Sequence, residues 1–375
     1  MKEMSLYIHI PFCKQKCLYC DFPSYSGRES LMDDYIDALS KEILDKACKY
    51  KVRSIFIGGG TPSYLNARNM EKLLSTINKL YFTDDIEFTM ECNPGTLNEE
   101  KLIIMKKNNV NRLSLGLQST NDSLLKEIGR IHNFNEFKEN YILARKHGFN
   151  NINADLMFGL PDQSIDDWKQ SLEDVISLNL DHISAYSLII EEGTCFYNLY
   201  ETDKLNLPNE NDERTMYSMT KDILKEHGYQ QYEISNYAKE GKECLHNKVY
   251  WQCEEYLGLG VSSSSFINEK RIKNIDNIKE YIKKINNNED VSEEIHINDE
   301  KDDMEEFMFM GLRMIEGIDT DKFKRKFGKD VYDVYKEPIE KHIKEGLLIY
   351  DLGKLKLSSK GIELSNYVMS DFILE

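Results

Sequence analysis

Short apolar segments alternate with amphipathic segments over roughly the first half of this 375-residue chain. In the stretch 31–49, for example, Tyr35, Leu39, Ile43 and Ala47 recur every four residues, which places them on one face of a helix. Strand–helix alternation predicts parallel strands joined by right-handed crossovers. The pattern therefore predicts an α/β fold, either a full or partial barrel or a doubly wound sheet. The expected strands are 5–10, 54–58, 86–92, 112–117, 151–157 and 182–188, and the expected helices are 31–49, 66–80, 98–107, 134–147 and 165–178.

The pattern changes after Leu188, and the second half of the chain reads as smaller units. A helix is expected over 209–227 and a strand over 231–236, followed by a Gly/Ser-rich segment, 244–266. Residues 287–306 hold ten acids and one lysine, which predicts a solvated linker or an exposed helix start. In 307–375, helical patterns precede two apolar runs around Asp351-Leu352-Gly353, a hairpin signal typical of a winged helix. The expected parts are a barrel (1–200), an extension (201–286), an acidic linker (287–306) and a C-terminal domain (307–375).

Composition narrows the class of protein. Hydrophobic residues make up 41% of the chain, enough for a packed core, while the formal net charge of −17 argues against a nucleic-acid binder. The C-terminal residues 307–375 are neutral overall, and their basic run over 322–329 is expected to be a solvated helix face. The sequence shows no apolar run of membrane-spanning length and no signal-peptide pattern, so we expect a cytoplasmic protein.

Three of the eight cysteines, Cys13, Cys17 and Cys20, lie within eight residues directly after the first expected strand. Three thiols this close are expected to converge on a metal rather than to pack into one core. A structural zinc site normally has four ligands in two separated pairs, and this chain has no second CxxC pair. An iron–sulfur cube can be held by three thiolates if its fourth iron takes an outside ligand. The other five cysteines are expected to be small buried hydrophobes.

Polar residues and glycines stand where the expected strands end. Gly58, Gly59, Gly60 and Thr61 follow the second strand, where glycine lets the backbone approach a ligand closely. Each later strand end contributes one polar side chain, and Arg130 follows further on. Any one of them alone could serve only to solvate or cap an element. Together, beside the cysteine loop, they predict a cofactor pocket at the carboxyl ends of the strands. The three strand-end side chains are Glu91, Gln118 and Asp155.

The Cys13-x3-Cys17-x2-Cys20 spacing is the signature of the radical S-adenosylmethionine (SAM) proteins. The chain resembles the oxygen-independent coproporphyrinogen III oxidases and their relatives, the HemW haem chaperones, over nearly its whole length. The motifs that carry this resemblance are SLYIHIPFCKQKCLYCDF, FIGGGTPS, MECNPGT, LGLQS, IGRIH, DLMFGLP and HNKVYW. The resemblance implies a partial (β/α)6 barrel, a [4Fe-4S] cluster on Cys13, Cys17 and Cys20, and SAM. It further implies SAM contacts from Tyr7, Tyr19, Gly58, Gly59, Gly60, Thr61, Glu91, Gln118, Arg130 and Asp155.

Two features favour the chaperone branch of this family. The oxidases have a further cysteine two residues after the third one, where this chain has Phe22, and they have a longer segment before the cluster loop. The HNKVYW segment matches the HNxxYW pattern of HemW, which makes His246 a candidate haem ligand. A histidine beside a tryptophan is also commonly a structural residue whose hydrogen bonds are made within the protein. Ser264 stands where the family often has a second histidine.

Three functions therefore remain open at the level of the sequence. The first is a haem chaperone that transfers haem to an acceptor protein, and it also implies an electron donor. The second is oxidative decarboxylation of coproporphyrinogen III, and the third is another radical SAM reaction on a tetrapyrrole, both within porphyrin metabolism. The sequence names neither the acceptor nor the donor, and it leaves a monomer and a homodimer equally open.

Overall fold

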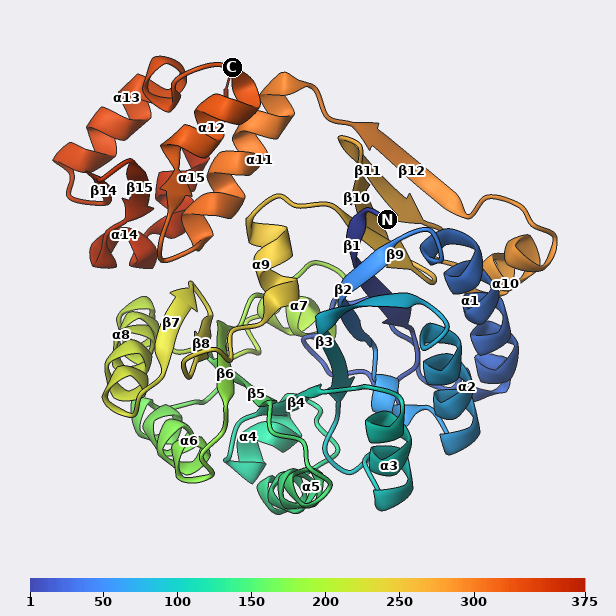
Figure 1. Ribbon diagram of the computed structural model, residues 1–375. Helices are drawn as coiled ribbons and strands as arrows, with labels where there is room; N and C mark the ends of the chain where they lie inside the picture. Colours follow the sequence, from blue (N-terminus) through green and yellow to red (C-terminus); the bar gives the residue numbers. More distant parts are fainter. Residues whose placement is uncertain (375) are drawn as a thin grey trace.

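The computed structural model describes residues 1–374, and its largest feature is one curved sheet of twelve strands (Figure 1). Six strands at its centre are parallel and follow one another in sheet order, which confirms the strands predicted from the apolar segments. The sheet does not close, so the fold is a partial (β/α)6 barrel. The six strands are β1 (Glu3–Ile10), β2 (Lys51–Gly59), β3 (Tyr81–Cys92), β4 (Arg112–Gln118), β5 (Ile152–Phe158) and β6 (His182–Ser187).

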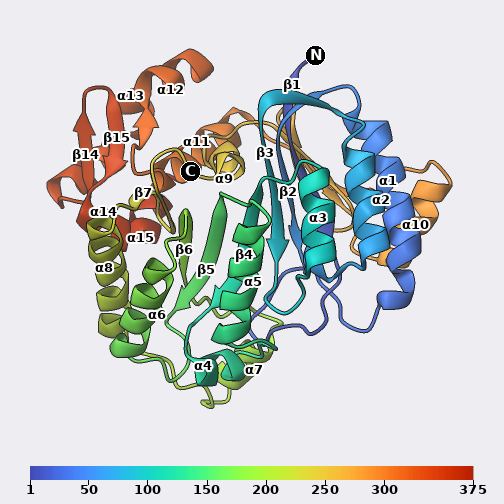
Figure 2. The same cartoon turned by 60° about the horizontal axis from the view of Figure 1, so that its bottom comes forward.

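The five predicted crossover helices are present and cover the outer face of the sheet (Figure 2). Four of them begin at an Asn or Ser whose side chain accepts a hydrogen bond from the first helical turn, which fixes where each helix starts. These helices are α1 (Met32–Ala47), α2 (Ala67–Ile77), α3 (Glu99–Lys107), α5 (Phe134–Lys146) and α6 (Ile165–Ser177). Shorter or later helices on the barrel are α4 (Asp122–Glu127), α7 (Cys195–Tyr200) and α8 (Glu210–Glu226).

The inner, concave side of the sheet is polar, and we call it the lumen. Hydrogen bonds link alternate side chains of neighbouring strands across it, as from Asn153 to Ser114 (2.8 Å), Ser184 (3.0 Å) and Asp155 (2.8 Å). The residues between them, such as Leu113, Leu115 and Leu117, are fully buried in the main hydrophobic core. A barrel interior is usually filled by branched apolar side chains, so a polar lumen indicates a binding site.

The extension continues the same sheet rather than forming a separate layer. On one side β9 (Tyr256–Leu259) pairs in parallel with β1, followed by antiparallel β10 (Ser264–Ile267), β11 (Lys270–Asn274) and β12 (Ser292–Ile297). On the other side β8 (Asn236–Ala238) pairs with β6, and β7 (Gln230–Glu233) forms the edge. Two helices complete this region, α9 (Leu245–Trp251) and α10 (Ile278–Asn286).

The acidic stretch expected as a linker is largely structured. It contains edge strand β12 and the start of α11 (Glu300–Arg313), whose N-cap is Asp299. Acidic side chains in the first turn of a helix are stabilised by its dipole, and charged residues protect an exposed sheet edge from pairing. The acidic residues therefore belong to an edge strand and to the start of a helix. Of the two expectations from the sequence, a solvated linker and an exposed helix start, the structure shows the helix start.

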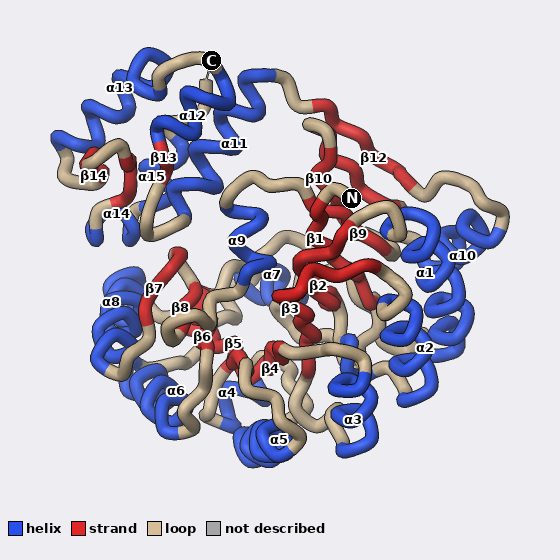
Figure 3. The backbone as a smooth tube through the Cα atoms, viewed as in Figure 1, coloured by secondary structure: helices blue, strands red, loops and turns tan. Residues whose placement is uncertain are grey.

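The C-terminal domain has a hydrophobic core of its own and carries the predicted hairpin (Figure 3). Backbone hydrogen bonds join it to the barrel, from Ile234 N to Arg313 O (3.1 Å) and from Ile315 N to Tyr232 O (3.1 Å). The basic run pairs with acids of its own domain, as Lys326 with Asp303 (3.3 Å). After α11 the elements are β13 (Ile318–Asp319), α12 (Thr320–Phe327), α13 (Val331–Lys344), β14 (Leu348–Asp351), β15 (Lys354–Leu357), α14 (Ser359–Glu363) and α15 (Ser365–Ser370).

The five scattered cysteines are not all buried. Of the five scattered cysteines, Cys92 and Cys244 are buried as expected, whereas Cys48 and Cys195 are exposed, each at a helix end.

No helix within residues 1–374 is long and apolar enough to cross a bilayer.

Candidate functional site

The three clustered cysteines lie in the loop that follows β1, at the carboxyl end of the parallel strands. Cys13 is buried, and its Sγ lies 3.5 Å from Thr61 Oγ1. Cys17 and Cys20 are partly exposed and form a turn in which Cys20 N–H donates to Cys17 O (3.3 Å). Burial raises the pKa of the Cys20 thiol to about 11, and the neighbouring Cys17 and Cys13 thiolates act in the same direction. The three thiols are thus close neighbours in one loop.

Segments from the far side of the barrel hold this loop in place. Leu18 N–H donates to Ile128 O (3.1 Å), and Leu18 O accepts from Phe196 N–H (3.0 Å). Gly129 has a φ of +79°, and a Cβ there would lie 3.0 Å from the Leu18 side chain. A glycine at this position therefore allows the end of α4 to pack closely against the cysteine loop.

The Gly-Gly-Gly-Thr segment ends β2 directly beside the cysteines. Gly60 N–H donates to Ile10 O (2.8 Å) and Thr61 N–H to Phe12 O (2.8 Å), which ties this segment to the cysteine loop. A Cβ on Gly60 would lie 3.1 Å from Cys13 Sγ, and one on Gly58 would lie 2.9 Å from Glu91 Oε2. Only glycine lets the strand end pass this close to both groups, as the sequence predicts.

Glu91 and Asp155 face each other across the lumen from β3 and β5. Glu91 Oε2 accepts from Gly59 N–H (3.2 Å), while Asp155 accepts from Ser114 Oγ (3.2 Å) and Asn153 Nδ2 (2.8 Å). Burial and the charge of Asp155 raise the pKa of Glu91 to about 8. Burial likewise raises the pKa of Asp155, against its hydrogen bonds. Two carboxyls with raised pKa values in one cavity are typical of a functional site and suit a cationic ligand.

Arg130 reaches into the same region after α4. Its Nη1 lies 3.5 Å from Cys17 Sγ, and its Nη2 donates to Asn93 Oδ1 (2.7 Å) and to Gly116 O. Its buried Nε has no hydrogen-bond partner among the described residues, so it retains a free donor. Asn93, which the sequence analysis missed, also donates to Thr61 Oγ1 (3.1 Å). Its place two residues after Glu91, directly after the end of β3, was the available signal.

The remaining expected SAM contacts occupy the same end of the barrel. Gln118 ends β4 with a φ of +71°, a conformation that L-residues rarely adopt outside turns and functional sites. Tyr7 lies in the lumen with its OH 3.0 Å from His9 Nδ1, and burial raises its pKa, followed by the charge of Glu91. Tyr19 lies between Cys17 and Cys20 and packs against Phe196 at 6.4 Å between ring centroids. The structure therefore brings Tyr19 and Gln118 to the end of the barrel that carries the cysteine loop, while Tyr7 lies deeper in the lumen, level with Phe56 of β2.

His246 lies deeper in the lumen, against Ser54 and Phe56 in the middle of β2. Its ring is fully buried, its Nδ1 is 3.0 Å from Ser54 Oγ, and its Nε2 is 2.9 Å from Tyr250 OH. Burial lowers its pKa to about 3, and Arg53 and Arg112 lower it further. The His246 ring stacks on Phe56 at 5.4 Å between centroids, and the Phe56 ring in turn lies 3.0 Å from where a Cβ on Gly58 would be, so Phe56 separates His246 from the glycine segment. Both ring nitrogens are engaged, so in this conformation neither faces a ligand.

The other parts of the HNKVYW segment also serve to seat α9. Glu87 of β3 accepts from Leu245 N–H (2.8 Å) and His246 N–H (3.0 Å), so its carboxylate caps the start of the helix. The Arg313 guanidinium stacks on Trp251 at 4.4 Å, which joins α9 to the C-terminal domain. Ser264 is exposed on β10. The segment therefore closes the amino end of the lumen and contacts the domain behind it (Figure 1).

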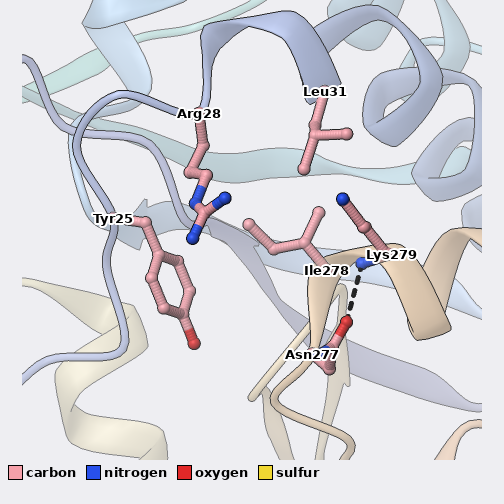
Figure 4. A pocket seen from close by; sticks show the side chains of 6 residues that line it. All are labelled: Tyr25, Arg28, Leu31, Asn277, Ile278 and Lys279. Atoms are coloured by element: carbon pink, nitrogen blue, oxygen red, sulfur yellow. Dashed lines mark hydrogen bonds between the residues drawn. The ribbon is translucent and has the colours of Figure 1, made fainter.

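A separate pocket of about 260 Å³ lies behind the cysteine loop, between that loop and α10 (Figure 4). Tyr25 O accepts from Cys13 N–H (3.0 Å), and Tyr25 OH donates to Asp276 O (3.2 Å), so Tyr25 joins the cysteine loop to the extension. Arg28 and Lys279 point into this pocket from either side. None of the residues expected to bind SAM lines it, and we regard it as a structural seam.

The residues at the carboxyl end fit an iron–sulfur cluster and SAM. Within residues 1–374, no three metal-ligating side chains are already converged on one point, but the cysteine loop offers three thiols and a nearby arginine donor. The glycine segment gives a cradle that a Cβ would fill, and the two lumen carboxyls can accept from an ammonium or a ribose diol.

Comparison with known proteins finds similar sequences over nearly the whole chain. A sequence model of the radical SAM superfamily matches residues 7–175, and a model of the HemN C-terminal domain matches residues 298–364. The chain is 38% identical to "Heme chaperone HemW" of Bacillus subtilis (strain 168) over 376 residues, covering 99% of each chain. It is 42% identical to the protein of the same name from Escherichia coli (strain K12) over 266 residues, covering 69% of each.

The fold has a solved counterpart. The structure of the Escherichia coli coproporphyrinogen III oxidase HemN, described as a radical SAM enzyme, superposes with a TM-score of 0.86. The superposition covers 99% of this chain and 90% of that one, at 24% sequence identity. At this identity the likeness establishes the radical SAM fold with its C-terminal domain and leaves the reaction to be argued from the site.

Proposed function

Since this chain belongs to the HemW family of radical SAM proteins, we propose that it is a haem chaperone that transfers haem to an acceptor protein. The observation that carries this proposal is the relationship over 99% of both chains to a protein named for that role. Phe22 supports it, because it stands where the oxidases have a further cysteine, and its side chain is 60% exposed beside the cysteine loop. Eight free thiols are compatible with the reducing cytoplasm.

We propose that Cys13, Cys17 and Cys20 hold a [4Fe-4S] cluster, with SAM bound beside it. When bound, the cluster supplies single electrons to SAM, which implies an electron donor as a second partner. The chain's own residues do the rest of the work at this end. Arg130 directs a guanidinium donor at Cys17 Sγ, while Glu91 and Asp155 receive the cationic groups of SAM. The glycine segment lies against both Cys13 and Glu91, and so it fixes the distance between the cysteine loop and this carboxyl.

The haem site is proposed deeper in the lumen, on the HNKVYW segment. His246 can serve as an axial ligand only after its ring leaves Ser54 and Tyr250, because both nitrogens are bonded in the closed conformation. Moving the His246 ring out breaks these two hydrogen bonds and the stacking on Phe56, and this loss is the free-energy cost of the movement. Ser264 is exposed and carries no imidazole, so His246 would be the one histidine of this site that binds the haem iron.

Haemin titration of the cluster-loaded chain tests this function. We expect a saturable change in the haem absorbance near about one equivalent per chain. His246→Ala is expected to weaken binding at least about tenfold, while His227→Ala, which removes an exposed histidine after α8, leaves it unchanged. No saturable change in the wild-type chain would contradict the chaperone role, and full binding by His246→Ala would contradict only the ligand. In a parallel anaerobic assay, coproporphyrinogen III with SAM and a reductant should yield no protoporphyrinogen-type product.

A further inference from the structure

A cavity of about 200 Å³ lies beside α9, where the C-terminal domain meets the extension. Residues from α9 and the loop after it, from strands β9 to β11 and from helix α11 surround it. Four aromatic rings and one thioether line this cavity, a composition typical of a site for an apolar planar ligand. These side chains are Tyr250, Trp251, Tyr256, Phe266 and Met310.

The two charged residues that line the cavity are each paired with an opposite charge. Arg271 donates to both carboxylate oxygens of Glu306, at 3.0 and 2.5 Å, and Glu254 accepts from Arg53. The side chains of Arg271 and Glu254 are 27% and 34% exposed, so the cavity reaches the surface on this side. The buried Nε1 of Trp251 has no hydrogen-bond partner among the described residues and leaves one donor for a ligand. The cavity therefore suits the apolar edge of a ligand that enters from solvent.

The cavity and His246 lie at the same level of the sheet. One row of cross-strand partners runs from β10 to β2 through Phe266, Tyr256, Ser5 and Ser54. Phe266 and Tyr256 line the cavity, while Ser54 Oγ lies 3.0 Å from His246 Nδ1. The cavity therefore adjoins the proposed haem ligand from the side, away from the strand ends that carry the SAM site.

The Tyr250 ring separates His246 from this cavity. Tyr250 follows His246 by four residues on α9, which places both side chains on one face of the helix. Its hydroxyl lies 2.9 Å from His246 Nε2, and its ring meets the rings of His246 and Tyr256 edge-on, at 5.1 and 4.7 Å between centroids. The other contacts of the imidazole, Ser54 and Phe56, are on β2. A ligand in the cavity therefore meets Tyr250 before it meets His246.

We propose that this cavity receives one edge of the haem and that Tyr250 is the gate residue that releases His246 to the iron. This inference rests on the proposed haem chaperone function. An imidazole binds a metal through a nitrogen with a free lone pair, and the Tyr250 hydroxyl occupies Nε2 in the closed conformation. When the macrocycle enters, Tyr250 turns away and the His246 ring is free to leave its place on β2. The C-terminal domain takes part in haem binding, because Met310 of α11 forms one wall of the cavity.

Haemin titration of the cluster-loaded chain tests the cavity. Met310→Trp fills it with an indole, and we expect haemin to bind at least about tenfold more weakly than to the wild type. Phe309→Trp places an indole on the same helix, but against the core of the C-terminal domain, and should bind haemin as the wild type does. SAM affinity, measured by equilibrium dialysis, should be unchanged in both variants, which shows that the barrel is intact. Wild-type haemin affinity in Met310→Trp would overturn the cavity as a haem site.

Tyr250→Phe tests the gate. This variant keeps the ring and its packing and removes only the hydroxyl that holds His246, so we expect haemin to bind about two- to tenfold more tightly. A tyrosine with a purely structural role would give unchanged or weaker binding, and either result would overturn the gate.

Alkylation of Cys253 provides a measurement on the wild-type chain that depends on no variant. Cys253 lines the cavity, and its thiol is partly exposed. We expect haemin to slow its reaction with N-ethylmaleimide at least about fivefold, while the exposed Cys48 reacts at an unchanged rate. Equal rates at Cys253 with and without haemin would overturn the cavity as a haem site, and this result decides the matter if Met310→Trp does not fold. Absence of saturable haemin binding by the wild-type chain would instead overturn the chaperone function on which the inference rests.

Discussion

Replacing Cys17 by serine is expected to remove the iron–sulfur cluster, with iron and sulfide content at least about tenfold below the wild type after reconstitution. The thiolate is the metal ligand, and a serine hydroxyl is not deprotonated near neutral pH. Cys17 is partly exposed, and its Sγ receives the Arg130 Nη1 donor at 3.5 Å, so the loss is not an effect of a disturbed core. The brown absorbance of the reconstituted protein should disappear with the iron.

The matched control is Cys48→Ser, which removes an exposed thiol at the end of α1, away from the cysteine loop. It should retain the full iron content and absorbance. A Cys17→Ser protein that kept both would contradict the assignment of the cysteine loop as the cluster site. A loss in both variants would point to a general sensitivity to reconstitution rather than to a ligand.

The second large effect concerns Glu42, which joins the barrel to the extension. This carboxylate is 1% exposed, and its Oε2 accepts from Gly260 N–H (2.7 Å) and Tyr281 OH (2.5 Å). Its Oε1 accepts from Lys46 Nζ (2.9 Å) and Asn274 Nδ2 (3.2 Å). Glu42→Ala would leave these buried donors without an acceptor, and we expect a loss of about 3–5 kcal/mol in the free energy of unfolding.

Thermal unfolding measures this loss directly. The midpoint of Glu42→Ala should fall by about 4–6 °C, since an unfolding entropy of about 2.1 cal/mol/K per residue gives a 375-residue chain roughly 1.3 °C per kcal/mol. Asp45→Ala, an exposed acid on the same helix, should unfold at the wild-type temperature. An unchanged midpoint in Glu42→Ala would mean that the extension is not an integral part of the barrel sheet.

The strands and crossover helices of the barrel could be predicted because each carries its own local signal. In β4 the leucines at 113, 115 and 117 face the helices, and in α1 one stripe of apolar residues faces the sheet. The cysteine loop and the glycine segment could also be predicted, since the spacing of the cysteines and the backbone freedom of glycine are properties of the sequence itself. Parallel strands place their carboxyl ends at one edge, which gathered Glu91, Gln118 and Asp155 correctly.

What the sequence did not reveal depends on long-range contacts. Strand β12 is short, acidic and exposed, and it becomes a strand only because β11 lies beside it. The place of His246 follows from Glu87, Ser54 and Tyr250, which lie on three different elements, and no local pattern predicts their meeting.

The account places haem and SAM on different elements of one lumen, and simultaneous binding tests this most directly. The cluster-loaded chain, saturated with SAM, is titrated with haemin and passed over a desalting column, and both ligands are counted. We expect about one haem and one SAM retained per chain, because haem is proposed to bind on α9 and SAM beside the cysteine loop after β1. Release of SAM in proportion to the haem that binds would place both ligands in one site and contradict the account.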